Sequence, residues 1–246
     1  MKKKIRLGVN IDHIAFIKKS RDTLYPSLID SAQTAEEAGA DLITIHLRED
    51  RRHIQEQDVV DIRNHVKVLN LEMAHTREMI DIALKTKPNF CCIVPEKRNE
   101  VTTEGGLNLL NLDSNNLKEL KNTILRFNDC GIKTSLFVDP DIEQVKLAKD
   151  TGAQLVELHT GFYANSISSD KKTSMLNIFK KASDFAFKNN LLVNAGHGLN
   201  YENVKPICKV KNLNELNIGH SIIARSVFIG LKDAIRQMIS IMRSCD

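Results

Sequence analysis

Eight apolar runs recur along the chain, and every one of them ends on polar residues. The pattern predicts eight strands, at residues 5–11, 42–47, 68–74, 90–94, 134–138, 155–159, 191–194 and 216–218. Short runs that are apolar throughout are typical of parallel strands buried on both faces. The polar ends lie at residues 10–13, 46–48, 72, 95–98, 139, 157–160, 194–198 and 217–220. Because parallel strands point the same way, we expect these ends to meet on one face.

Segments with helical spacing separate the runs. We expect helices between Tyr25 and Gly39, at 58–66, from about 79 to Pro88, and at 117–128, 141–150, about 173–189 and 203–209. Strand and helix alternating along the whole chain predict an α/β fold with a parallel sheet covered by helices. Eight repeats favour closure into a single (β/α)8 TIM barrel spanning residues 1–246. An open doubly wound sheet is the alternative, but residues 8–13 lack its G-x-G-x-x-G turn.

Two segments do not fit the repeat. Residues 96–113 form a long polar stretch containing Gly105-Gly106, which is either a hinged lid over the site or a surface insertion. Residues 221–243 are strongly apolar, and Phe228, Leu231, Ile235, Met238 and Met242 alternate spacings of three and four. We expect this stripe to pack on the barrel, with some apolar surface left for a subunit contact.

Composition excludes several classes of protein. The 246 residues suit one barrel, and the 35 Lys and Arg against 31 Asp and Glu give a net charge of +4. No basic stripe interleaved with aromatic residues is present, so no nucleic-acid partner is expected. No apolar run reaches the length of a membrane span, and polar residues interrupt any export signal near the Lys-rich start. Five cysteines without a C-x-x-C pair favour reduced thiols and a cytoplasmic location.

Glycines follow the last two predicted strands, in the segments 194–198 and 217–220. Barrels commonly bind phosphate at this pair of positions, because glycine lets backbone N–H groups approach an anion and a helix start adds a favourable dipole. The glycines could instead only turn the chain, but two such turns here favour phosphate.

Most of the eight histidines lie at strand ends. His53 follows the second strand and only His65 and His75 look peripheral; the other five are His13, His46, His159, His197 and His220. Imidazoles that converge suit proton transfer near neutral pH. They could instead bind a metal together with Asp12, Glu72 or Asp139. Without a motif such as H-E-x-x-H, acid–base use is favoured and no metal is expected.

Two glutamates and a set of arginines add to this chemistry. Glu72 lies within the third strand, where partial desolvation would raise its pKa and make it a usable base. Glu157 on the sixth strand has the same possibility, although a buried salt bridge is the interpretation that the residues alone favour.

Five arginines follow strands one, two and four: Arg21, Arg48, Arg51, Arg52 and Arg98. One or two of them gripping phosphate would suit two phosphorylated substrates or one bisphosphate.

The strand lysine that an enzyme Schiff base requires is missing from the ends of the apolar runs. Seven blocks resemble the pyridoxine 5′-phosphate synthase family of deoxyxylulose-dependent vitamin B6 biosynthesis. They are residues 7–15, 46–54, 70–74, 94–98, 100–106, 193–199 and 215–220, in order along nearly the whole chain. In that family the Schiff base joins the two substrates, which agrees with the missing lysine.

The resemblance implies a TIM barrel with additional helices, assembled as a homo-octamer. It implies condensation of 3-amino-2-oxopropyl phosphate with 1-deoxy-D-xylulose 5-phosphate to pyridoxine 5′-phosphate, inorganic phosphate and water. No cofactor or metal is implied. The segment 96–113 then resembles the closing lid of the family. Ala224 stands where a glycine is common and Phe162 occupies a variable place, but neither position carries a role.

Site residues carry over by motif. By resemblance, His46 and Glu72 are proton acceptors, His197 is a proton donor, and Glu157 stabilises charge in the reaction, against the salt bridge favoured above. The site for the amino-ketone phosphate is implied at Asn10, Arg21, Gly198, Gly219 and His220. The site for the sugar phosphate is implied at Asp12, His13, Arg48, His53 and Thr102. A metal-dependent barrel enzyme and a non-catalytic sensor of phosphorylated metabolites remain the rival classes.

Overall fold

Eight parallel strands close into a barrel in the computed structural model, which describes residues 4–21, 23–96 and 105–245. The strands are β1 (Arg6–Asn10), β2 (Leu42–His46), β3 (Leu69–Met73), β4 (Phe90–Ile93), β5 (Lys133–Val138), β6 (Leu155–His159), β7 (Leu192–Gly196) and β8 (Leu213–Ile218). Each strand pairs with the next, and β1 returns to pair with β8. The predicted TIM barrel is confirmed, and the open sheet is excluded.

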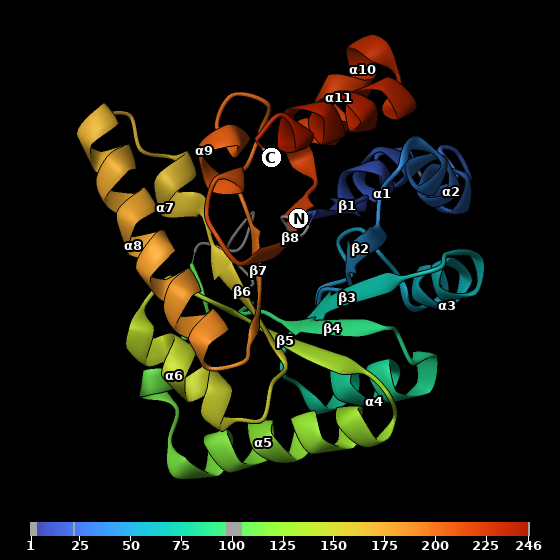
Figure 1. Cartoon of the computed structure of the whole chain (residues 1–246). Coiled ribbons are helices and arrows are strands. Elements are labelled where there is room, and N and C mark those ends of the chain that lie inside the picture. The colour runs from blue at the N-terminus through green and yellow to red at the C-terminus, as the bar shows by residue number, and fades with distance from the viewer. Residues whose placement is uncertain (1–3, 22, 97–104, 246) are drawn as a thin grey trace.

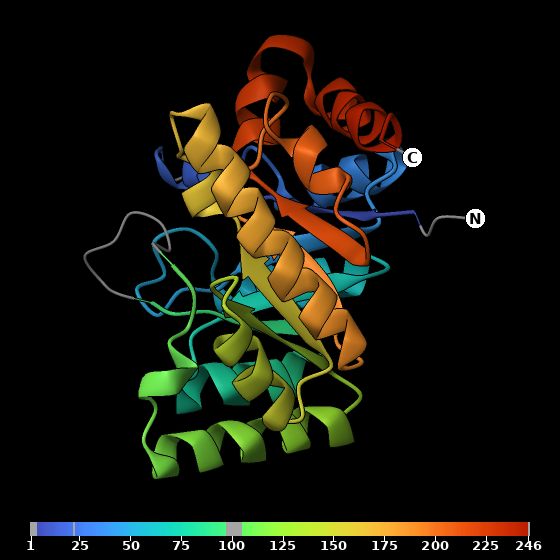
Figure 2. The ribbon, with the colours of Figure 1, turned by 60° about the vertical axis from the view of Figure 1, so that its left-hand side comes forward.

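Helices surround the barrel, as Figures 1 and 2 show from two directions. They include α2 (Leu28–Ala38), α3 (Glu56–His65), α4 (Arg77–Thr86), α5 (Ser114–Asp129), α6 (Ile142–Asp150), α8 (Ser169–Lys188), α9 (Val204–Cys208), α10 (His220–Ile229) and α11 (Leu231–Arg243). The α5 helix lies lowest in both views, and α10 and α11 lie at the top. The helices expected from the sequence are all present, with ends that differ by a few residues.

Local side chains explain where several helices begin. The Ser27 side chain accepts a hydrogen bond from the backbone N–H of Asp30 at the start of α2. Gln55 and Asp58 form a reciprocal capping box at the start of α3. This box places the helix start at Glu56, two residues before the expected one, because it satisfies backbone donors that the hydrophobic pattern does not reveal.

Three short helices were not expected from the sequence. They are α1 (Asp12–Lys19), α7 (Gly161–Ala164) and the 3-10 turn η1 (Leu109–Asn111). Both α1 and α7 begin directly after a strand, so the polar ends assigned to loops are also first turns of helices. The η1 turn lies inside the segment 96–113, of which residues 97–104 fall outside the described residues.

The last apolar segment is two helices and not one continuous stripe. Gly230 separates α10 from α11 and has a φ of 80°, a conformation that favours glycine. Ile235, Met238 and Met242 on α11 are buried, whereas Phe228 at the end of α10 is 84% exposed. Most of the expected stripe thus packs on the barrel, and Phe228 is part of the apolar surface left exposed, because the turn at Gly230 breaks the helical register.

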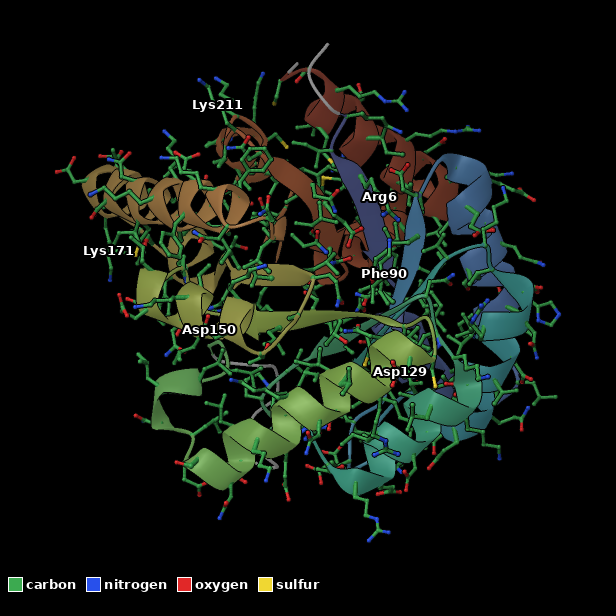
Figure 3. All side chains as sticks on the ribbon, turned by 60° about the horizontal axis from the view of Figure 1, so that its bottom comes forward. Arg6, Phe90, Asp129, Asp150, Lys171 and Lys211 are labelled. Carbon is green, nitrogen blue, oxygen red and sulfur yellow. The ribbon has the colours of Figure 1, made fainter. Side chains whose placement is uncertain are left out.

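Apolar side chains fill the layer between the strands and the helices, but polar side chains fill much of the barrel interior. Thr44 donates to Asn217 across 2.9 Å, and the Asn194 amide donates to Glu215 across 2.9 Å. Glu215 also pairs with Arg6, whose guanidinium carbon lies 5.5 Å from the centre of the Phe90 ring (Figure 3). This buried network links the N-terminal ends of the strands to the opposite end.

Among the described residues, no helix combines the length and the apolar character that crossing a bilayer would require.

Candidate active site

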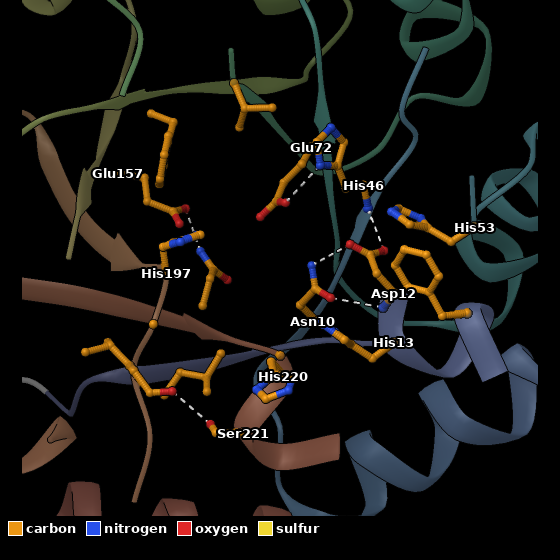
Figure 4. Close-up of a pocket in the computed structure, with 18 of the residues that line it drawn as sticks. Asn10, Asp12, His13, His46, His53, Glu72, Glu157, His197, His220 and Ser221 are labelled. Atoms are coloured by element: carbon orange, nitrogen blue, oxygen red, sulfur yellow. Dashed lines mark hydrogen bonds and ion pairs between the residues drawn. The ribbon is translucent and has the colours of Figure 1, made fainter. Parts of the chain in front are cut away.

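A cavity of about 370 Å³ opens at the C-terminal ends of the strands. All but two of the predicted site residues line it: Asn10, Asp12, His13, His46, Arg48, His53, Glu72, Glu157, His197, Gly198, Gly219 and His220. Figure 4 shows His46 and Glu72 on one side of the cavity and Glu157 and His197 on the other. The structure thus brings together side chains that are far apart in the sequence, as expected for the ends of parallel strands.

The other two predicted residues are Arg21 and Thr102. Arg21 is exposed in the turn after α1 and does not line the cavity. Thr102 lies outside the described residues, as does Arg98. Among the remaining predicted arginines, Arg51 forms ion pairs with Glu56 and Glu78, and Arg52 forms one with Asp50. Of the four predicted arginines that the structure describes, Arg48 is therefore the one that lines the cavity.

His46 lies between two carboxylates. Its Nε2 atom is 2.7 Å from an oxygen of Glu96, and its Nδ1 atom is 3.8 Å from an oxygen of Glu72. The backbone N–H of His46 donates to Asp12 across 2.9 Å, and the Asn10 amide donates to the other oxygen of Asp12 across 2.8 Å. Both the ring and the backbone of His46 are thus held in place before any substrate binds.

Burial changes the protonation of the carboxyl groups in the cavity. It raises the pKa of Glu72 well above its ordinary value, and the nearby carboxyl groups of Glu157 and Asp12 raise it further. Burial also raises the pKa of Asp12 to about 6, against the opposing effect of His46. For Glu157, burial and the charge of Glu215 together raise the pKa to about 8. These groups can therefore exchange protons near neutral pH.

Within residues 4–21, 23–96 and 105–245, no basic side chain pairs with Glu157. Its carboxyl group accepts a 2.8 Å hydrogen bond from the Asn217 amide, and the Cys92 thiol lies 3.9 Å away. The salt bridge that the residues alone favoured is therefore wrong for Glu157. An arginine does enter the barrel from the opposite end, but Arg6 pairs with Glu215.

His197 is held by the end of β6. The Thr160 hydroxyl is 2.6 Å from the carbonyl oxygen of His197, and the His159 ring lies 5.0 Å from the His197 ring. His159 in turn contacts Asp139 through Nδ1 at 3.1 Å. Burial and, to a smaller extent, the charge of His159 lower the pKa of His197 to about 4. The His197 ring is therefore neutral at neutral pH, and its imidazolium form requires uptake of a proton.

The other histidines form the rim nearest α1. His13 and His220 lie 5.1 Å apart, and burial together with His220 lowers the pKa of His13. Burial, with help from His46, lowers the pKa of His53 to about 3. The backbone N–H of Ile54 donates to Nδ1 of His53, so the neutral ring carries its hydrogen on Nε2. His53 can then offer that N–H to an anion in the cavity.

The last glycine turn brings backbone close to the cavity. A Cβ atom on Gly219 would lie 2.9 Å from the Cβ atom of Asn10, so only glycine fits without displacing the neighbouring strand. Gly219 directly precedes α10, and His220 and Ser221 at the start of that helix line the cavity. A helix start combined with close backbone approach is an arrangement that favours phosphate.

Comparison with known proteins decides the family. A family model described as "Pyridoxal phosphate biosynthesis protein PdxJ" matches residues 7–244. The chain belongs to this family. The expected resemblance is thereby confirmed over nearly the whole chain.

Relatives within the PdxJ family are close. A pyridoxine 5′-phosphate synthase of Legionella pneumophila (strain Corby) is 50% identical over 244 residues, covering 99% of this chain and 97% of the relative. An enzyme of the same name from Idiomarina loihiensis is 49% identical over 241 residues, covering 98% of each chain.

Solved structures with little sequence similarity share the fold. Phosphoribosyl anthranilate isomerase from Thermus thermophilus superposes with a TM-score of 0.59 at 11% identity, covering 98% of this chain and 100% of the other. The Thermotoga maritima enzyme of that name, in its monomeric form, gives 0.59 at 14% identity, covering 98% and 99%. At such identities the likeness concerns the barrel alone.

Sequence reasoning assigned no role to several residues that shape the PdxJ-family site. Asn217 lines the cavity and holds Glu157, and Glu215 lies below it in β8. The predicted eighth strand began at residue 216 and did not include Glu215. Three residues are too few to show that alternate side chains, Glu215 and Asn217, point into the barrel. Glu96 and His159 appeared among the strand ends, but nothing in the sequence shows that they contact the two catalytic histidine candidates.

Proposed function

We propose that this chain acts as a pyridoxine 5′-phosphate synthase that joins 3-amino-2-oxopropyl phosphate to 1-deoxy-D-xylulose 5-phosphate. Pyridoxine 5′-phosphate, inorganic phosphate and water are the products. The observation that carries the proposal is the single cavity where His46, Glu72, Glu157 and His197 converge in a chain of the PdxJ family.

Two phosphate subsites are proposed within the cavity, and they adjoin where His13 lies beside His220. Gly198, Gly219, His220 and Asn10 supply backbone N–H groups and polar side chains for the amino-ketone phosphate. Arg48, His53, His13 and Asp12 are proposed for the sugar phosphate, with the buried Arg48 as its main positive charge. Arg21 and Thr102 remain predictions for these two subsites, because one is exposed and the other lies outside the described residues.

Condensation requires proton transfers at several different atoms. The amine of one substrate attacks the ketone of the other, and imine formation and ring closure release water. His46 and Glu72 accept protons in this scheme, and His197 donates one to a leaving oxygen. Glu157, opposite Glu72, stabilises positive charge that develops on the imine when it is ionised. The shifted pKa values of Glu72, Glu157 and His197 support a division of roles among groups of one cavity.

Incubation with both substrates tests the activity directly. Formation of pyridoxine 5′-phosphate, followed by mass spectrometry together with release of inorganic phosphate, is the expected result. Absence of product with folded protein would contradict the proposal. A sensor of phosphorylated metabolites would instead bind the substrates and release nothing.

A metal-dependent barrel enzyme is the second candidate, and one observation favours it. Ligand atoms of Asp12, His46 and Glu72 all lie within 4.8 Å of one another, close enough to hold one cation. Stoichiometric metal in the purified protein, with activity lost to a chelator and restored by that metal, would support this candidate. Full activity after exhaustive chelation would support metal-free acid–base chemistry.

Assembly and location complete the proposal. The exposed apolar residues include Leu24, Tyr25, Val227 and Phe228, which are 91%, 82%, 73% and 84% exposed. Side chains of this kind support a homo-oligomer, and family resemblance makes an octamer the expected form. Three of the five cysteines, Cys91, Cys92 and Cys208, are buried, which supports a reducing compartment such as the cytoplasm.

A further inference from the structure

Glu96 is a buried carboxylate beside the cavity to which the proposed reaction assigns no role. It follows β4 and its side chain is 3% exposed. One carboxylate oxygen lies 2.7 Å from Nε2 of His46, and the other accepts the backbone N–H of Glu49 across 3.0 Å. Glu96 therefore bridges the end of β4 to the loop after β2, across the strand that carries Glu72.

The contact with Glu96 fixes the hydrogen on the His46 ring. The 2.7 Å separation between a Glu96 oxygen and Nε2 of His46 is a hydrogen bond, and a carboxylate only accepts hydrogen bonds. Nε2 of His46 must then carry a hydrogen, and the neutral ring has its lone pair on Nδ1, which faces Glu72.

We propose that Glu96 is a positioning residue for His46. It holds the ring with Nε2 protonated and so presents Nδ1 as the atom that accepts a proton from substrate. Its second carboxylate oxygen accepts the backbone N–H of Glu49 and so also fixes the loop that carries Arg48. This inference rests on the proposed role of His46 in the synthase reaction. A buried carboxylate that fixes the tautomer of a catalytic imidazole acts by the same logic in hydrolase triads.

Other charged groups around His46 cannot replace Glu96. Asp12 is engaged with the backbone N–H of His46 and with Asn10, and Glu72 is 3.8 Å from Nδ1 on the other side of the ring. His53 and Arg48, the remaining neighbours, are donors toward the cavity. Among the described residues, Glu96 is the one carboxylate within hydrogen-bond distance of the His46 ring.

Steady-state kinetics of two variants test the role. Glu96→Gln keeps an acceptor oxygen but loses the charge, so we expect kcat to fall about tenfold to a hundredfold with little change in KM. Glu96→Ala also frees the Glu49 N–H, so KM for the sugar phosphate should rise as well. Glu119→Gln on the exposed face of α5 is the matched control. Values for Glu96→Gln within about twofold of this control would overturn the proposal.

Imidazole nitrogen NMR gives a readout that a purely structural role would not move. With ¹⁵N-labelled histidine, the unaltered protein should show His46 protonated on Nε2, and the signal is assigned by its loss in His46→Gln. Glu96→Ala should populate the other tautomer. A wild-type His46 protonated on Nδ1 alone would contradict the proposal, even if no Glu96 variant folds.

His46→Gln also separates this inference from the proposed function. Normal turnover in His46→Gln would remove His46 from the reaction and overturn the role on which the inference rests. If His46→Gln is inactive while Glu96→Gln is normal, only the positioning role fails. When Glu96→Gln is added to His46→Gln, we expect no further loss of the residual rate, because Glu96 acts through the ring.

Discussion

Burial has opposite effects on the pKa values of the acidic and the basic side chains in the cavity. Burial pushes carboxyl groups such as Glu72 toward their neutral form and also pushes the His197 imidazole toward its neutral form. An empty cavity therefore holds less charge than its composition suggests. Bound phosphates bring negative charge into this space, which favours protonated histidines. Substrate binding and proton uptake should consequently be coupled.

His197 is the clearest single-residue test of the proton donor. His197→Ala should lower kcat about a hundredfold or more, because general acid catalysis contributes rates of that order. Binding of inorganic phosphate, measured by calorimetry, should remain, since Gly198 and Gly219 offer backbone groups. Normal turnover in this variant would remove His197 from the scheme.

Glu157 should make the stability of the fold depend on pH. Its pKa is raised from 4.5 to about 8 by burial and by Glu215, so the folded chain binds a proton more tightly than the unfolded chain. The contribution of Glu157 to the free energy of unfolding should therefore be fully present below pH 4.5 and be lost as the pH rises toward 8. In Glu157→Gln that decline should be smaller.

Denaturant unfolding of wild type and Glu157→Gln at pH 5 and pH 8 measures this effect. Equal slopes of stability against pH in the two proteins would show that Glu157 is ionised as readily in the folded chain as in the unfolded one.

Short helices at the strand ends set the position of the catalytic histidine candidates. Gly161 is the first residue of α7, and a Cβ atom there would lie 2.3 Å from Nε2 of His159 and 3.0 Å from Cδ2 of His197. The rings of both histidines thus pack directly against the backbone of this turn. The α7 helix, though only four residues long, determines how the β6 and β7 ends face each other.

Gly161→Ala should therefore displace both rings. We expect kcat to fall about tenfold, because a misplaced acid loses much of its effect, while the melting temperature changes little if the rings can rotate aside. Kinetics together with thermal unfolding measure the two effects. Unchanged kcat would mean that the ring positions are not critical.

At the scale of the whole molecule, sequence alone predicted the barrel and most of its cavity. Eight apolar runs with polar ends predicted the strands and the face on which their ends meet, because parallel strands point the same way. The contacts inside the cavity could not be predicted. The pairing of Glu96 with His46 and of Asn217 with Glu157 depends on register between strands, which the hydrophobic pattern leaves undefined.

Apolar surface at the end of α10 makes a prediction about assembly. Phe228 is 84% exposed and Val227 is 73% exposed, in the last turn of α10 before Gly230. Phe228→Asp should lower the sedimentation coefficient of the assembly if this surface is buried between subunits. Leu125→Asp, on exposed α5, is the matched control. Identical sedimentation of Phe228→Asp and wild type would place the subunit contact elsewhere.

The polar interior of the barrel makes thermal robustness and turnover hard to improve separately. Arg6, Glu215 and Asn217 form a connected column that ends beneath Glu157. An engineer who replaced this column with aliphatic side chains would remove ion pairs that cost much to bury, and such replacements often strengthen a fold. The same change would remove the hydrogen bond from Asn217 to Glu157, so a barrel with higher thermal stability would have a lower turnover rate.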